Sequence, residues 1–347
     1  MLVRTRVPAL PSMLLRLLSA VILCLALSAP GCRHTYQKQR EPSKEQKLEL
    51  YSTTATYLYE DDDLERAQEQ AVKALAVDPE NRAMRRMIGW IRLRKSGNED
   101  LIVAERFFRD LRREGDENES TALGLAITCE RLGTAYDDVS RALTAGEREP
   151  EKGKERAASA RELAAKARRY WQESIKLCDG ILAAGEGNTN AMNALQRVHA
   201  LAGSYEESLG WSARLLERTA AELTSWRRML QEKELTEREE TLFRDNERAA
   251  LDLQTDTHIF VATLLFRLQR YEEALQHLDA VVDDSPNLAH AYSLRGQMRA
   301  RAGQYEGAVA DLDRYLALSD SPYEHPDVQR AFELRAEAQK HVGVQLE

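Results

Sequence analysis

The chain has 347 residues, of which 43% are hydrophobic and 31% are charged. This apolar content suffices for a buried core and excludes a wholly disordered chain, while the scarcity of glycine (17) and proline (9) argues against an all-β fold. Acidic residues outnumber Lys and Arg by 57 to 49, a net charge of −8, so we expect no nucleic-acid partner.

The first segment, residues 1–31, has the composition of a secretory signal peptide. Arg4, Arg6 and Arg16 precede the 13-residue run Leu17–Ala29, which is apolar apart from two serines. A membrane-spanning helix needs about 20 such residues. A basic start, a short apolar middle and small residues at the end therefore predict export across a membrane.

The end of this segment, Ala29-Pro30-Gly31-Cys32, resembles the lipobox of bacterial lipoproteins, in which the cysteine is acylated and becomes the new amino terminus. The sequence departs from that pattern at Ala29, where Leu is preferred, and at Pro30, where Ala or Ser is preferred. The resemblance implies lipidation of Cys32 and stable membrane attachment. The alternative is an ordinary signal peptide that leaves Cys32 free or in a disulfide.

Residues 32–46 are polar and read as a lipidated tether to the membrane. Arg33 follows the cysteine, where an Asp retains enteric lipoproteins at the inner membrane. The resemblance therefore implies the outer membrane, facing the periplasm, rather than the inner membrane. The remaining cysteines, Cys129 and Cys178, lie in apolar helical stretches; we expect buried thiols, with a disulfide as the alternative.

The body of the chain repeats with a period of 34 residues. Tyr271-Glu-Glu-Ala-Leu275 recurs as Tyr305-Glu-Gly-Ala-Val309, 34 positions later. This period and its small and aromatic positions resemble the tetratricopeptide repeat (TPR), a helix–turn–helix unit. The resemblance implies an all-α, TPR-like superhelix of antiparallel helix pairs. The units are 48–81, 82–115, a weaker 117–145, 189–222, 255–288 and 289–322, followed by a closing helix.

Small residues at fixed repeat positions allow two helices to cross closely, and glycine permits the turn between them. The residues expected in these packing and turn roles are Ala67, Gly89, Ala274, Gly296, Gly303 and Ala308.

Long helices interrupt the regular spacing in the middle of the chain. Apolar residues at helical spacing predict one long helix over 151–185, and Thr236 with Glu239 predicts a capping box that opens a second, ending near Arg267. We expect that second helix to pair with a helix over 205–233 as one elongated hairpin. The predicted organisation is a signal peptide 1–31, a tether 32–46, amino-terminal repeats 47–145, an irregular long-helix region 146–254, and carboxyl-terminal repeats with the closing helix 255–347.

No motif for catalysis, nucleotide binding or metal binding occurs in the sequence. No two of the seven histidines stand three or four residues apart, so no helical metal-binding pair is expected. We therefore expect no enzyme, no cofactor and no metal. The alternative is an enzyme or enzyme-accessory subunit with a pocket formed by the long helices.

The best candidate for a partner groove is the basic helix over 82–95. Arg86, Trp90 and Arg94 stand at i, i+4 and i+8, on a face that lines the groove in the family it resembles. An aromatic residue between arginines suits an acidic or extended peptide segment. The alternative is that Trp90 packs between helices while the arginines pair with the acidic residues of 60–65.

Together these features predict a lipid-anchored TPR scaffold for protein–protein interactions in the bacterial cell envelope. Some bacterial lipoproteins with such repeats assist the assembly of outer-membrane proteins or of pilus secretins, which makes assembly of such components a more specific hypothesis.

Overall fold

A computed structural model describes residues 42–145, 150–185, 187–232 and 234–344 of the chain. The chain divides into two compact units, Met1–Lys47 and Leu48–Glu347. In the first unit only residues 42–47 are described, where the first described helix begins. The predicted signal peptide, Cys32 and most of the predicted tether lie outside the described residues.

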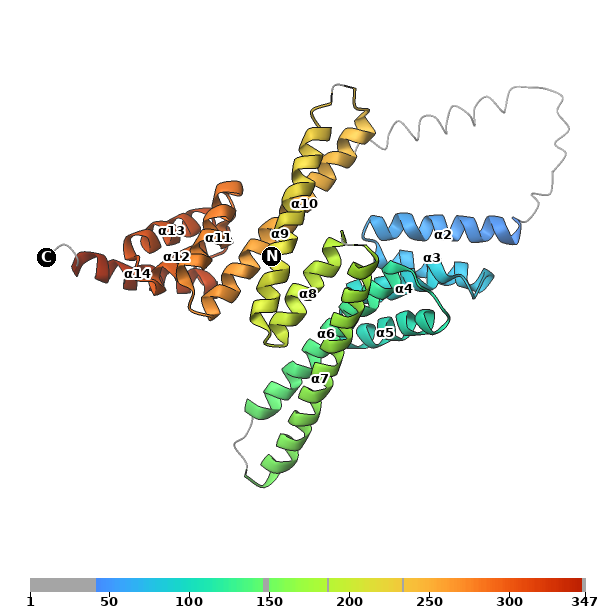
Figure 1. Ribbon diagram of the computed structural model, residues 1–347, viewed down its shortest axis with the longest axis horizontal. Helices are drawn as coiled ribbons and strands as arrows, with labels where there is room; N and C mark the ends of the chain where they lie inside the picture. The colour runs from blue at the N-terminus through green and yellow to red at the C-terminus, as the bar shows by residue number, and fades with distance from the viewer. Residues whose placement is uncertain (1–41, 146–149, 186, 233, 345–347) are drawn as a thin grey trace. The chain divides into compact units, whose positions relative to one another are not determined.

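The described residues form 13 helices and no strand (Figure 1). The helices are α2 (Lys44–Glu60), α3 (Leu64–Val77), α4 (Arg82–Lys95), α5 (Asn98–Arg113), α6 (Glu119–Ala145), α7 (Pro150–Ala184), α8 (Thr189–Leu201), α9 (Tyr205–Met229), α10 (Glu237–Arg267), α11 (Tyr271–Asp284), α12 (Ala289–Arg301), α13 (Tyr305–Leu318) and α14 (Pro326–Val344).

From α3 onward each helix packs against the next, and the helices α4 and α6, α6 and α8, and α12 and α14 also touch as second neighbours. Short loops make successive helices antiparallel, and contact between second neighbours stacks one pair on the next. The all-α, TPR-like fold class is confirmed.

Several helix starts follow directly from the sequence. Asp63 and Asn81 cap α3 and α4 by accepting hydrogen bonds from backbone amides three residues on. The predicted capping box is present: Thr236 accepts from the amide of Glu239, and the Glu239 carboxylate accepts from the amide of Thr236. The helix it opens ends at Arg267, as expected.

The middle of the chain contains two long hairpins, α6–α7 and α9–α10, where the sequence predicted one (Figure 1). The segment 117–145, expected to be a weak repeat unit, forms the single 27-residue helix α6. No turn divides this helix. Gly133, which the repeat pattern placed near a turn, has helical geometry and packs against the Trp171 side chain of α7. The long-helix region therefore begins before residue 146.

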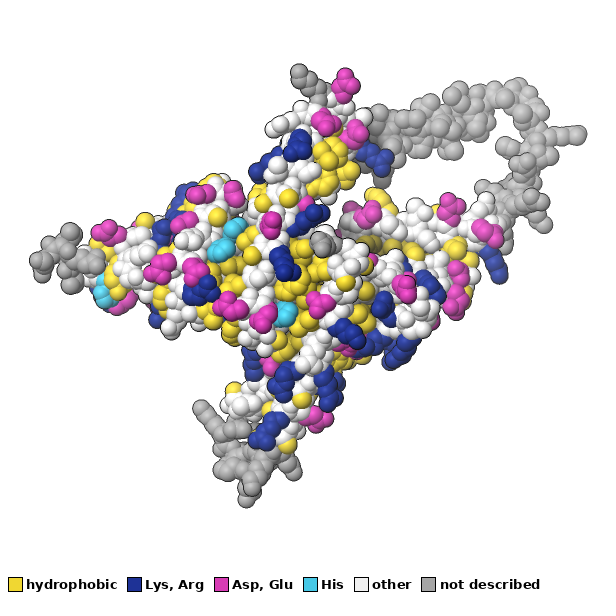
Figure 2. Space-filling model, viewed as in Figure 1, with side chains coloured by type: hydrophobic (Ala, Val, Ile, Leu, Met, Phe, Trp, Pro, Cys, Tyr) yellow, Lys and Arg dark blue, Asp and Glu magenta, His cyan; other side chains and the backbone are white. Residues whose placement is uncertain are grey.

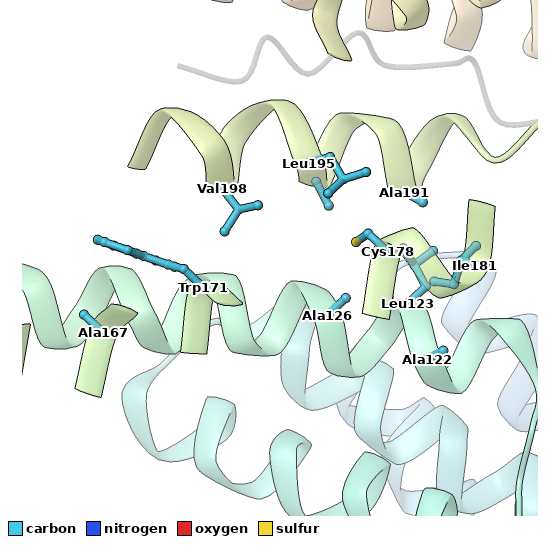
Figure 3. Packing of buried hydrophobic residues seen from close by; sticks show 11 residues of the cluster. Ala122, Leu123, Ala126, Ala167, Trp171, Cys178, Ile181, Ala191, Leu195 and Val198 are labelled. Atoms are coloured by element: carbon cyan, nitrogen blue, oxygen red, sulfur yellow. The ribbon is translucent and has the colours of Figure 1, made fainter. Parts of the chain in front are cut away.

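The largest buried cluster joins α6, α7 and α8. Figure 3 shows Trp171 and Cys178 of α7 beside Leu195 and Val198 of α8. Cys178 and Cys129 are both free and buried. Burial raises the pKa of both thiols, that of Cys178 to about 12. The structure therefore shows the buried thiols and not the alternative disulfide.

The small residues singled out from the repeat pattern lie at helix contacts. Ala67, Ala274 and Ala308 are fully buried. A Cβ added at Gly89 would come within 2.8 Å of the Phe108 ring, and one at Gly296 within 2.9 Å of Leu312 Cγ. Both sites are thus closed to larger side chains. Gly303 has φ +77° in the turn before α13.

Candidate functional site

The basic residues predicted to form a partner groove on α4 have partners within the chain. Arg86 donates from Nε to Thr121 Oγ1 at 2.7 Å and from Nη2 to Asp116 Oδ2 at 2.9 Å. Arg94 forms an ion pair with Asp62 at 2.7 Å. Both guanidinium groups therefore hold neighbouring segments of the chain.

Trp90, between the two arginines, is also engaged. Its Nε1 donates to Ser120 Oγ at 2.9 Å, and its ring meets the Phe108 ring edge-on with the centroids 5.8 Å apart. These contacts agree with the packing alternative for Trp90, and the Arg94–Asp62 pair agrees with pairing to 60–65. Arg86 instead pairs with the loop before α6. A role for these residues in partner binding stays a prediction.

A pocket lined by several arginines, called the arginine pocket below, lies among α6, α8 and α10, which are the first helices of successive pairs. It has a volume of about 800 Å³, and the α4–α5 loop and the starts of α5 and α9 complete its lining. Its charged lining residues are four arginines and two carboxylates: Arg131, Arg141, Arg197, Arg267, Glu130 and Asp138.

The four arginines differ in how far they are neutralised. Arg197 binds the buried Glu130 through two hydrogen bonds of 2.7 and 2.8 Å. Burial lowers the pKa of Arg197, but the Glu130 carboxylate outweighs that effect and the net direction is upward. Arg141 pairs with Asp137. Arg131 donates to Ser96 Oγ and the Leu93 carbonyl, which carry no charge.

Arg267 is exposed, and its side chain has no hydrogen bond or ion pair with the other residues that the structure describes. Arg131 and Arg267 thus leave positive charge in the pocket that no carboxylate in direct contact balances. Leu101, Leu201 and Phe260 add apolar surface to the same lining. The pocket combines cations with apolar contacts, which suits an anionic segment that also carries apolar side chains.

This pocket was not predicted from the sequence, because its arginines come from three helices that are far apart in the chain. The sequence does place arginines on the first helices of successive pairs. Only the packing of these helices shows that the arginines line the same pocket.

A second pocket, of about 710 Å³, lies between α8 and the α9–α10 hairpin. It fits the location expected for the alternative of an enzyme. Its lining has one carboxylate, Glu222, which binds Arg218 at 3.1 Å. A pair of converging acids, as a hydrolase needs, is not found in this lining.

The structure also joins two histidines that the sequence did not connect. His258 of α10 and His277 of α11 lie with their Nδ1 atoms 2.9 Å apart. Within the described ranges, no three His, Cys, Asp or Glu residues gather as a metal site. No helix in the described part of the chain combines the length and apolar composition that a membrane span needs.

Residues 262–322, from the end of α10 through α13, match a family model of the tetratricopeptide repeat. This part of the chain is therefore similar to tetratricopeptide repeats. The match falls on the units where the 34-residue period was clearest, and this fold supports a scaffold for protein–protein interactions. No curated protein matches the chain significantly.

Solved structures with similar folds are distant. A tetratricopeptide repeat protein from Parabacteroides merdae is 17% identical, with a TM-score of 0.36 over 84% of this chain and 99% of its own. PilF of Pseudomonas aeruginosa is 11% identical, with a TM-score of 0.35 over 87% and 91%. The TPR2AB domain of yeast Sti1, in complex with an Hsp90 peptide, is 13% identical, with a TM-score of 0.28 over 84% and 98%. These scores are too low to carry a functional argument.

Proposed function

We propose that this protein is a lipid-anchored scaffold of the bacterial cell envelope that binds a protein partner in the arginine pocket of its TPR repeats. The observation that carries the proposal is the pocket itself, an opening of about 800 Å³ lined by first helices of successive pairs. The family match on residues 262–322 supports a binding rather than a catalytic role.

The partner segment that suits this pocket is acidic and extended. Four arginines against two carboxylates give the lining an excess of positive charge, although the whole chain has a net charge of −8. Such a local reversal of sign speeds association with an acidic segment and disfavours basic ones. The half-buried apolar side chains of Leu201 and Phe260 then contact the side chains of that segment.

Capture of partners from solubilised envelopes tests this proposal, with the partner identified by mass spectrometry. Arg267→Glu should reduce capture about tenfold, because it places a carboxylate where the partner's acids bind. Arg168→Glu on α7, exposed and outside the pocket, should leave capture unchanged. Equal capture by the two variants would exclude the arginine pocket as the binding site.

The groove residues predicted on α4 need a separate test, because Trp90 has packing contacts. We expect Trp90→Ala to lower the melting temperature, since it removes the contact with Phe108 and the hydrogen bond to Ser120. Capture of the partner should persist in the folded variant. A loss of about 2 kcal/mol in binding with an unchanged melting temperature would instead restore Trp90 as a partner contact.

Membrane attachment through Cys32 is proposed from the sequence, in which a small residue precedes a cysteine after a short apolar run. Cys32→Ser should move the protein from the membrane pellet to the soluble periplasmic fraction. Pelleting that persists after both high-salt and carbonate washes would exclude a lipid anchor. Density-gradient separation of the two membranes then tests the outer-membrane location. A captured outer-membrane or pilus component would support a role in assembly.

A further inference from the structure

The outer end of the α9–α10 hairpin is poorly covered. Among the described residues from 224 to 249 none is buried. Trp226 and Phe243 face each other with ring centroids 5.8 Å apart, and both are half-buried. Two helices that pack only on each other leave much of their apolar surface in water, which makes such an end a place for association.

One face of α10 at this end is exposed and carries an ordered pattern. Arg238, Leu242, Asp245 and Ala249 stand at i, i+4, i+7 and i+11, so they form one stripe along the helix. All four are exposed, and Leu242 keeps 55% of its surface in water. In Figure 2 apolar side chains gather near the tip of this hairpin, with side chains of both charges around them.

The two charged residues of the stripe differ from their neighbours. Arg244 binds Glu240 within α10, and Arg227 of α9 binds Glu247. The side chains of Arg238 and Asp245 make no hydrogen bond or ion pair with any other described residue. They stand on opposite sides of Leu242, one positive and one negative.

We propose that this stripe binds the same stripe of a second copy of the chain, with the two α10 helices antiparallel about a twofold axis beside Leu242. Antiparallel pairing places Arg238 of each copy opposite Asp245 of the other. The two Leu242 side chains then meet within about one residue's rise of 1.5 Å. A twofold contact requires a surface that complements itself, and this stripe does so in both charge and apolar character.

A second copy accounts for this pattern better than a basic or acidic partner does. A strongly charged partner would leave Arg238 or Asp245 beside a like charge, whereas self-pairing satisfies both. The stripe spans about three helical turns on each copy, which is short for a stable dimer, so the association is weak and reversible.

Charge reversal tests the pairing, using the full chain in detergent and sedimentation equilibrium. In Arg238→Asp the new carboxylate lies opposite Asp245 of the other copy, and in Asp245→Arg the new guanidinium lies opposite Arg238 of the other copy. Each variant alone should therefore associate about tenfold more weakly than the wild type, because like charges repel. An equimolar mixture of the two should regain wild-type association, because each charge then meets its opposite. Arg168→Asp on α7, also exposed, should change nothing.

Several results would overturn the proposal: a wild-type chain that stays monomeric, single variants that associate as well as the wild type, or a mixture no stronger than its components. Loss of a captured envelope protein in Leu242→Asp, with self-association intact, would assign the stripe to a different partner.

Oxidative crosslinking detects the contact even when it is brief. Leu242→Cys should form a disulfide with a second copy, whereas Arg248→Cys, exposed on another side of α10, should not. Cys129 and Cys178 are buried and common to both variants, as are the other cysteines of the chain, so the difference reports position alone. Equal crosslinking at the two positions would contradict the proposed face.

Discussion

The amino-terminal and carboxyl-terminal repeats stack their helices by different means. In the amino-terminal part, the fully buried Phe108 of α5 inserts its ring between α4 and α6. Gly89 and Gly124 face this ring so closely that neither could carry a Cβ in place. One aromatic ring therefore fixes the spacing of two successive first helices, and the fit depends on volume.

In the carboxyl-terminal part, paired charges join the helices beside the apolar contact of Gly296 with Leu312. Asp311 of α13 is only 3% exposed and binds both Arg295, at 2.7 Å, and Arg299, at 2.8 Å, of α12. Arg295 also binds Asp279 of α11 at 2.7 Å. Three successive helices thus share one cluster of paired charges.

Part of this cluster recurs in the next repeat. Asp313 follows Asp279 by one 34-residue period, and it binds Arg335 of α14 as Asp279 binds Arg295. The Phe108 ring, which packs against two glycines, stabilises the fold through the apolar surface that it removes from water. Buried ions lose their hydration, so they contribute to stability only in the arrangement that pairs every charge. We hypothesise that the amino-terminal contact supplies more stability and that the carboxyl-terminal one selects the order in which repeats stack.

Removing the aromatic ring should have the largest effect on this comparison. Phe108→Ala empties a fully buried site between three helices, so the free energy of unfolding of the amino-terminal repeats should fall by about 3–5 kcal/mol. Denaturant titration followed by circular dichroism measures it. Phe332→Ala, at a partly exposed phenylalanine of α14, should change it by less than about 1 kcal/mol. Equal losses would show that the ring does not wedge the helices.

Neutralising the buried carboxylate of Asp311 tests the contribution of the carboxyl-terminal charge cluster to stability. Asp311→Asn keeps the volume but removes the charge that two arginines share, and we expect a loss of about 3 kcal/mol in the same titration. The matched control is Asp313→Asn, because Asp313 is 49% exposed in its pair with Arg335 and should contribute less than about 1 kcal/mol. Similar losses for both would mean that burial does not distinguish the two pairs.

The sequence predicts these two regions to different extents. The 34-residue period, the capping box at Thr236 and the small residue at Gly296 are local patterns, and each predicted a feature that the structure contains. The Asp311 cluster and the arginine pocket were not predicted, because both depend on which helices meet in space. Gly133 shows the limit most clearly, since its pattern resembles a repeat position while its real neighbour is Trp171, 38 residues away.

Overpacking one helix crossing should have a smaller effect than either deletion. Gly296→Leu forces the Leu312 side chain and the backbone carbonyl of Ala308 away, and the expected loss is about 1–3 kcal/mol. A Cβ added at Gly180 of α7 would meet no atom within 4 Å, so Gly180→Leu should leave stability unchanged or raise it by up to about 1 kcal/mol through helix propensity. A Gly296 variant as stable as the Gly180 variant would show that the α12–α13 crossing tolerates a side chain.

The smallest effect concerns the histidines that join α10 to the carboxyl-terminal repeats. Burial, followed by the nearby His277, lowers the pKa of His258 from its ordinary 6.5 to about 4, although Asp284 acts in the opposite direction. Burial also lowers the pKa of His277, against the effect of Glu273. The folded chain therefore binds fewer protons here than the unfolded chain does in this range, so stability is complete above about pH 6.5 and declines toward about pH 4.

Melting temperatures measured from about pH 7.5 to about pH 4 should show this decline, and His258→Phe should make it shallower because the unfolded chain then has one proton fewer to gain. The slope should not vanish, since His277 and the carboxylates still titrate. His290→Asn removes an exposed histidine from the start of α12 and should keep the wild-type slope. If all three curves are parallel, protonation at the α10–α11 contact does not limit stability.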